Sequence, residues 1–239
     1  MTYCVAVKVN AGMVFCSDSR TNAGVDQVNT YKKLFTFGNP GQRQFIICTS
    51  GNLATSQAVL NKIKADISKA DPVNLFTVNN IHDAAEYIGR LSVAQQEKTG
   101  FGPAFQSSFI LGGQIIGGPM ELVLVYPEGN YINASEGTPF LQIGESKYGK
   151  PILDRIIKKD TDLQTCALCA LVSMDSTVKS NLTVGPPIDI QLYQADSLNL
   201  SSYYHLTEDN NYLRNISYSW NEKLIEAFRQ LPPLDESLN

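Results

Sequence analysis

The sequence predicts an α+β domain in which two antiparallel β-sheets stack face to face and pairs of helices cover their outer faces. Blocks with period-two hydrophobicity alternate along the chain with pairs of segments of helical period. Strict strand–helix alternation, which would favour a parallel sheet, does not occur. No linker-like composition and no internal repeat divides the 239 residues, so we expect a single domain over residues 1–239.

The period of the apolar residues defines each expected element in turn. Val5, Val7 and Val9 alternate with their neighbours as in a strand, and residues 10–12 can turn the chain back. After residue 52 the spacing becomes helical. Strands are expected over residues 4–9, 13–16, 34–37, 45–49, 107–111, 122–126, 131–134, 141–144 and 188–193, and helices over residues 53–67, 81–100, 150–159, 163–179 and 211–231.

Charge and apolar content exclude several classes of protein. With 19 basic and 23 acidic residues the formal net charge is −4, and no basic stripe suggests a nucleic-acid partner. No apolar stretch approaches the roughly 20 residues of a membrane span, and the N-terminus lacks the features of a signal peptide. Five cysteines without a regular spacing indicate a reduced setting. We therefore expect a cytoplasmic protein with no nucleic-acid and no membrane partner.

The common cofactor and catalytic motifs do not occur in the sequence. Its glycines fit neither a P-loop nor a dinucleotide fingerprint, and no nucleophile-elbow serine is present to act with His82 or His205. We expect both histidines to be structural or exposed. Cys166 and Cys169 form a C-x-x-C pattern inside an apolar helical segment, which indicates core packing rather than a redox or zinc site. The sequence thus predicts no cofactor and no metal.

The N-terminus itself is the remaining candidate for catalysis. Methionine is commonly removed when the second residue is small, and loss of Met1 would leave Thr2 with both a hydroxyl and a free α-amine. An α-amine has a pKa of about 7.7–8.0, so it can accept the hydroxyl proton near neutral pH. In most chains a threonine at position two has no catalytic role, so the hypothesis depends on the residues around it.

Three further positions suit this chemistry. Lys33 opens an apolar strand, and its cation near Thr2 would lower the pKa of both the hydroxyl and the amine. Asp18 ends the second expected strand, so it lies near Thr2 if the first two strands pair, where it can orient Lys33. Gly51 stands between a strand and a helix, where a backbone N–H is a suitable oxyanion donor. Alternatively, Lys33 belongs to a solvated turn and Asp18 is an ordinary surface carboxylate.

Short stretches with these residues resemble a known family. They are Thr2, the Ser-Asp-Ser-Arg run at 17–20, residues 21–24, residues 31–33 and the Thr-Ser-Gly run at 49–51. Together they resemble the catalytic β-subunits of the proteasome, which implies the four-layer αββα sandwich of the N-terminal-nucleophile (Ntn) hydrolases. The resemblance implies Thr2 as nucleophile, Asp18 and Lys33 as its activators, and Gly51 as oxyanion donor.

The middle of the chain extends the resemblance. The Gly-Glu-Ser-Lys-Tyr-Gly stretch at 144–149 is similar to that of the bacterial proteasome homologue Anbu (ancestral beta subunit), which the chain resembles over nearly its whole length. It implies that Ser146 supports the amine, with Glu145 as the competing residue. Further on, where the family usually has an aspartate and a serine, this chain has Asn181 and either Thr183 or Val184.

These observations combine into an expected function. We expect a proteasome-type threonine protease that hydrolyses peptide bonds, and the resemblance implies a homo-oligomer, either a ring or an open spiral stack. Thr21, Tyr31 and Gly51 are expected to line the pocket for a peptide or protein substrate. Two alternatives stay open, namely an Ntn amidase acting on a small amide or peptide-like metabolite and a structural assembly subunit without catalysis. Any ATP-dependent partner would be a separate protein, because the sequence has no nucleotide-binding motif.

Overall fold

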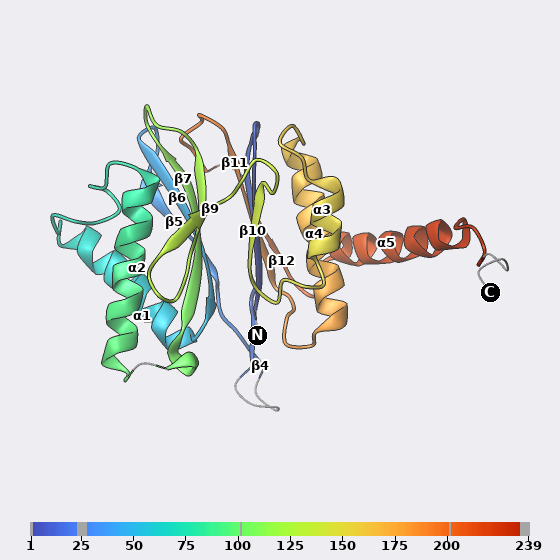
Figure 1. Ribbon diagram of the computed structural model, residues 1–239, viewed down its shortest axis with the longest axis horizontal. Helices are drawn as coiled ribbons and strands as arrows, with labels where there is room; N and C mark the ends of the chain where they lie inside the picture. Colours follow the sequence, from blue (N-terminus) through green and yellow to red (C-terminus); the bar gives the residue numbers. More distant parts are fainter. Residues whose placement is uncertain (1, 23–27, 101, 201, 235–239) are drawn as a thin grey trace.

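The chain forms four layers, as the computed structural model shows for residues 2–22, 28–100, 102–200 and 202–234 (Figure 1). The strands are β1 (Tyr3–Val9), β2 (Gly12–Asp18), β3 (Arg20–Asn22), β4 (Val28–Thr30), β5 (Leu34–Asn39), β6 (Arg43–Gly51), β7 (Ser107–Ile115), β8 (Glu121–Val125), β9 (Tyr131–Asn133), β10 (Phe140–Gly144), β11 (Ile188–Gln194) and β12 (Ser202–Leu206). The helices are α1 (Leu53–Ser68), α2 (Ile81–Lys98), α3 (Lys150–Ile156), α4 (Leu163–Ser180) and α5 (Asn211–Arg229).

Two five-stranded antiparallel sheets make the inner layers. The first sheet has the order β10-β1-β2-β11-β12, and the second has the order β5-β6-β7-β8-β9. Helices α3 and α4 cover the outer face of the first sheet, and α1 and α2 cover that of the second (Figure 1). Strands β3 and β4 form a separate short hairpin. The α+β class and the αββα arrangement expected from the sequence are confirmed.

Each sheet is buried on both faces, one against helices and one against the other sheet. Successive side chains of a strand therefore enter different cores, because they point in opposite directions. In β1, Val5 packs in the core beneath α3 and α4, whereas Ala6 packs in the core between the sheets. In β6, Ile47 packs beneath α1 and α2, whereas Ile46 faces the first sheet. Three apolar cores therefore hold the four layers together, and both positions of the alternating pattern are apolar in the central strands.

The structure corrects the sequence prediction at three short strands. Strands β3, β4 and β12 were not expected, and His205 lies in β12. All three strands lack a continuous apolar face, and β12 is an edge strand whose central side chains are exposed. The spacing of hydrophobic residues therefore could not predict these three strands. Met1 and residues 23–24 lie outside the described residues, so the removal of Met1 and the match at these positions stay predictions.

Helix α5 projects away from the four layers (Figure 1). Its expected apolar face forms in part, since Leu213 and Ile216 pack against the core under α4. Further along the helix the apolar side chains have no such cover, and Leu224 and Phe228 are 49% and 75% exposed. Within the described part of the chain, no helix has both the length and the apolar character needed to cross a membrane.

Strand register brings the predicted site residues to one end of the sandwich. Cys4 pairs with Ser17, so Asp18 lies beside the start of β1. In the second sheet Leu34 pairs with Cys48, and the amide of Thr49 donates to the carbonyl of Lys33 at 3.0 Å. The ends of β1, β2, β5 and β6 therefore meet where Thr2 enters the fold.

Replacing Ile46 by alanine should destabilise the protein by about 2–5 kcal/mol, because the side chain is fully buried between the sheets and the change leaves a cavity there. Ile116→Ala is the matched control, since Ile116 is 65% exposed and the change should stay within about 0.5 kcal/mol. Denaturant unfolding at one fixed protein concentration measures both. Equal losses in the two variants would contradict the described packing.

Candidate active site

A cavity of about 470 Å³ opens between the two sheets at the start of β1. The residues that line it are Thr2, Thr21, Lys33, Thr49, Ser50, Gly51, Leu53, Ser56 and Gly144. Three of the predicted site residues, Thr2, Lys33 and Gly51, thus share one cavity. Of the expected pocket residues, Thr21 and Gly51 line this cavity, whereas Tyr31 is not among the described residues that do.

Asp18 and Lys33 form a buried ion pair behind Thr2. The Lys33 Nζ lies 2.8 Å from Asp18 Oδ1, and the exposed fractions of their side chains are 5% and 0%. Lys33 also donates to the carbonyl of Arg20 at 2.6 Å. The alternative reading of a solvated lysine and a surface carboxylate is therefore wrong.

Asp18 fixes the start of the first strand as well as the lysine. Its carboxylate accepts hydrogen bonds from the backbone amides of Tyr3 at 3.1 Å and Gly185 at 3.3 Å. Burial is the largest influence on the pKa of Asp18 and raises it, while Lys33 and the two amides act in the opposite direction. Gly185 was not predicted, because it comes from a loop far along the chain that only the folded structure brings here.

Gly51 lies on the exposed rim of the cavity, at the end of β6. Its φ is +96°, and a Cβ at this position would lie 2.4 Å from the carbonyl oxygen of Gln106, so only glycine fits. Helix α1 starts two residues later, with the Asn52 side chain accepting from the amide of Thr55 at 2.9 Å. The positive end of the α1 dipole therefore lies beside the cavity, where it favours negative charge.

The loop after β10 contacts the backbone of Thr2. The amide of Glu145 donates to the carbonyl of Thr2 at 2.8 Å, and the Glu145 side chain accepts from Asn181 Nδ2 at 2.9 Å. Ser146, the predicted support of the amine, is half-buried, and its carbonyl accepts from Lys150 and from Gln142. Ser146 is not among the described residues that line the cavity.

A second network, of hydrogen bonds to the Tyr3 hydroxyl, holds the start of β1 against α4 and β10. The Tyr3 hydroxyl lies 2.6 Å from Ser173 Oγ in α4 and accepts from Gln142 Nε2 at 2.6 Å. Burial raises the pKa of Tyr3, which keeps its hydroxyl neutral. Sequence spacing gave no hint of these contacts, since the three residues lie far apart in the chain. They fix the residue that follows Thr2.

The other candidates from the sequence lie elsewhere. His82 stacks on Tyr131, and His205 Nδ1 lies 2.7 Å from the buried Asp189. Cys166 and Cys169 belong to the core between α4 and the first sheet. The expected packing role of the two cysteines is confirmed. Among the described residues, no group of three or more His, Cys, Asp or Glu side chains is arranged to hold a metal ion.

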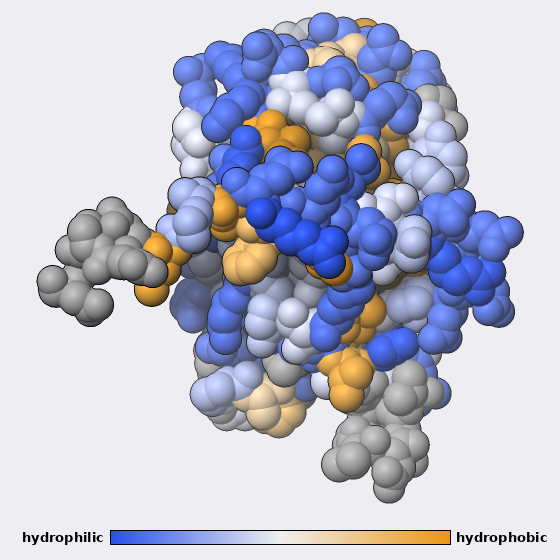
Figure 2. All heavy atoms as spheres, turned by 90° about the vertical axis from the view of Figure 1, so that its right-hand side faces the viewer, coloured by the Kyte–Doolittle hydropathy of each residue, from blue (hydrophilic) through white to orange (hydrophobic). Residues whose placement is uncertain are grey.

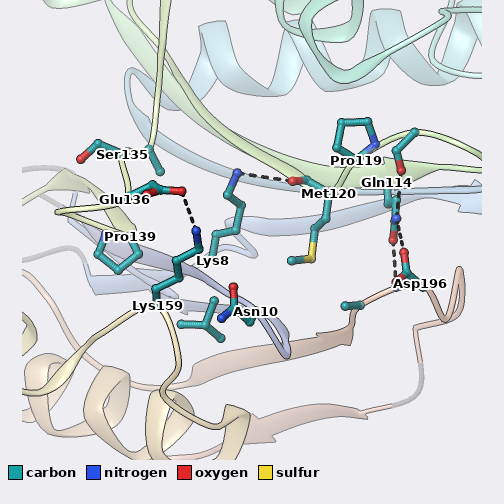
Figure 3. A pocket seen from close by; sticks show the side chains of 14 residues that line it. Lys8, Asn10, Gln114, Pro119, Met120, Ser135, Glu136, Pro139, Lys159 and Asp196 are labelled. Atoms are coloured by element: carbon teal, nitrogen blue, oxygen red, sulfur yellow. Dashed lines mark hydrogen bonds and ion pairs between the residues drawn. The ribbon is translucent and has the colours of Figure 1, made fainter.

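A second cavity, of about 400 Å³, lies at the opposite end of β1 (Figure 3). Lys8 contacts Glu121 Oε2 at 2.8 Å and the carbonyl of Met120 at 3.4 Å, and Lys159 pairs with Glu136. Its lysines are thus already matched with carboxylates. Among the described residues that line the cavity beside Thr2, Lys33 is the one charged side chain, and its partner Asp18 is not part of the lining.

Comparisons with known proteins agree with this fold. The family model described as proteasome subunit matches residues 2–191, and the chain belongs to the proteasome family. Its fold is that of the proteasome-type Ntn hydrolases. No curated protein matches the chain.

The most similar solved structures include several Anbu proteins. Anbu (ancestral beta-subunit) from Yersinia bercovieri is 43% identical, with a TM-score of 0.94 over 98% of this chain and 100% of that one. The helical assembly of the Anbu complex from Pseudomonas aeruginosa is 46% identical, with a TM-score of 0.94 over the whole of both chains. The Anbu (Gly-1) mutant from Hyphomicrobium sp. strain MC1 is 42% identical, with a TM-score of 0.94 over 98% and 100% of the two chains.

Replacing Lys33 by methionine should destabilise the protein by about 3–5 kcal/mol, because the charge of Asp18 is then buried without its partner. Adding Asp18→Asn should recover part of the loss. Lys150→Met is the control, since its pair with Asp154 is half-exposed and contributes about 0–1 kcal/mol. Denaturant unfolding of the four proteins checks the ranking. A double variant less stable than Lys33→Met would contradict the pairing.

Proposed function

We propose that this protein is a threonine-type amide hydrolase that cleaves peptide bonds, with Thr2 as nucleophile once Met1 has been removed. The observation that carries the proposal is the buried ion pair of Lys33 with Asp18, because Lys33 lines the same cavity as Thr2. A buried cation at this point favours the deprotonated hydroxyl and the neutral amine. The proteasome-type fold supports the same class of reaction.

The proposed reaction begins with attack of the Thr2 hydroxyl oxygen on the substrate carbonyl. The α-amine of Thr2, directly or through one water, takes the hydroxyl proton. Negative charge moves to the carbonyl oxygen, where the amide of Gly51 and the N-terminus of α1 stabilise it. The amine then returns the proton to the leaving nitrogen as the C–N bond breaks. A water molecule hydrolyses the resulting ester and regenerates Thr2.

The roles of four residues predicted from the sequence follow from this scheme. Thr2 supplies the nucleophile and the base, Lys33 the electrostatic activation, Asp18 the orientation of Lys33, and Gly51 the oxyanion donor. Ser146 was predicted to support the amine. The cavity walls, rich in hydroxyl groups beside the apolar Leu53, suit an uncharged peptide side chain. We place the reaction in the cytoplasm, where the five buried free thiols would stay reduced.

Replacing Thr2 by alanine should abolish turnover and leave the fold intact, because the nucleophile is lost while the backbone contacts of residue 2 stay in place. Thr2→Ser should retain activity. The measurements are hydrolysis of unfolded proteins, short peptides and small amides, and mass spectrometry of a covalent adduct with an electrophilic trap. Thr207→Ala, an exposed position far along the chain, is the control.

Two outcomes of that experiment would change the proposal. Turnover by Thr2→Ala equal to that of the unaltered protein would exclude the N-terminal mechanism. Cleavage of small amides without cleavage of peptides would instead support the amidase.

We further propose that the protein acts as a homo-oligomer and that α5 contributes to its contacts. The relative from Pseudomonas aeruginosa is described as a helical assembly. Leu224, Ile225 and Phe228 on α5 are between 41% and 75% exposed. Figure 2, which shows the side of the molecule from which α5 projects, has apolar side chains among hydrophilic ones on this face. Exposed apolar area of this kind is typical of contact surfaces.

Replacing Leu224 and Phe228 by glutamate should lower the mass of the assembly, because buried carboxylates without partners oppose association. Light scattering after size-exclusion chromatography measures the mass. Lys223→Glu is the control, since it introduces a carboxylate on the same helix without removing an apolar side chain. An unchanged mass for the double variant would exclude α5 from the contacts.

A further inference from the structure

Glu145 is the residue opposite Thr2 across the pairing of β1 with β10. Tyr3 pairs with Gly144, so the next position on each strand matches Thr2 with Glu145. The amide of Glu145 donates to the Thr2 carbonyl at 2.8 Å, and a Cβ on Gly144 would lie only 1.9 Å from that same oxygen. The chain at residues 144–145 therefore runs in close contact with the backbone of Thr2.

The carboxylate of Glu145 is nearly buried and only weakly compensated. Its side chain is 10% exposed, and Oε2 accepts from Asn181 Nδ2 at 2.9 Å. Among the described residues, the cation paired with it is Lys147, at 3.9 Å from Oε1, whose side chain is 81% exposed. An ion pair with so exposed a lysine contributes little, whereas a buried carboxylate is costly without a cation.

Asn181 is itself held in one orientation. Its Oδ1 accepts from the amide of Thr183 at 3.0 Å and from the hydroxyl of Thr183 at 2.6 Å. With the oxygen used in this way, the amide nitrogen is directed to Glu145. The carboxylate is thus fixed at the Thr2 end of the strand pair before any change at the N-terminus.

We propose that Glu145 is a positioning residue whose carboxylate holds the α-amino group of Thr2 after Met1 has been removed. The proposal rests on the proposed function for the presence of that amine. A freed ammonium at Thr2 supplies a buried cation that the other described residues do not provide for Glu145, and the contact orients the amine beside the hydroxyl. In this proposal Glu145 takes the role predicted for Ser146, because Glu145 is the residue in register with Thr2.

The contact has an electrostatic consequence for the amine. A carboxylate beside an amine favours the ammonium and raises its pKa, whereas the Lys33 ammonium lowers it. Asp18 offsets part of the effect of Lys33, and Lys147 is too exposed to contribute much. Removing the charge of Glu145 therefore lowers the pKa of the amine.

Competitive acylation of the α-amine tests the proposal without any need for catalysis. The full chain is prepared with Thr2 as its first residue, by cleavage of a removable N-terminal fusion. The rate of acylation by acetic anhydride is then followed from pH 5 to pH 9 by mass spectrometry of the N-terminal peptide. Glu145→Gln keeps the shape of the side chain and the acceptor for Asn181, and should lower the pKa of the amine by about one unit. Acylation well below that pKa should be about tenfold faster.

Two further variants make the result specific. Ser146→Ala should leave the pKa of the amine unchanged, and Glu145→Asp should restore part of the shift. An unchanged pKa in Glu145→Gln, or an equal shift in Ser146→Ala, would overturn the proposal. A shift found in a protein that hydrolyses no amide would instead count against the proposed function and leave the role of Glu145 standing.

Discussion

The ion pair of Asp18 with Lys33 links the two sheets at the end where Thr2 enters the fold. Asp18 ends β2 in the first sheet, and Lys33 precedes β5 in the second. Two buried charges are tolerated only when they face each other and their remaining hydrogen-bonding groups are satisfied. Here the amides of Tyr3 and Gly185 and the carbonyl of Arg20 meet that requirement. The same contacts fix the separation of the sheets, the start of β1 and therefore the cavity.

Burial of both sheet faces provides the rigid frame for this pair. The inter-sheet core contains few places for a polar group, so charged side chains are confined to the ends of the strands, where backbone groups can satisfy them. Glycine is needed at this end of the sandwich where two backbone segments approach each other closely. At Gly144 the carbonyl of Thr2 leaves no space for a side chain, and at Gly51 the carbonyl of Gln106 does the same. Close contacts between backbone segments at these two glycines therefore define the shape of the cavity wall.

Hydrophobic period was sufficient to predict the helices and the long strands, because each of them buries a continuous apolar face. It failed for β12, whose three central side chains are all exposed, and for the polar hairpin of β3 and β4. Thr2, Asp18, Lys33 and Gly51 were within reach of sequence reasoning, since each stands at a strand end that pairing brings to one place. The contacts of Asn181 with Glu145 and of Gly185 with Asp18 were not, because they depend on the packing of segments that lie 36 and 167 residues apart in the chain.

Sequence spacing cannot decide between Ser146 and Glu145 as the residue that supports the amine. The two are neighbours in one loop, and the sequence does not show which side chain points toward Thr2. Strand register favours Glu145, and under the proposed mechanism charges of both signs then act on one amine. Lys33 would favour the neutral form that can accept a proton, while Glu145 would favour the ammonium and hold it in place. An amine dominated by Lys33 would be a weak base at any pH, and one dominated by Glu145 would stay protonated near neutrality. Under the proposed mechanism, the opposing effects of the two charges would keep the pKa of the amine near the working pH, where a general base is most effective.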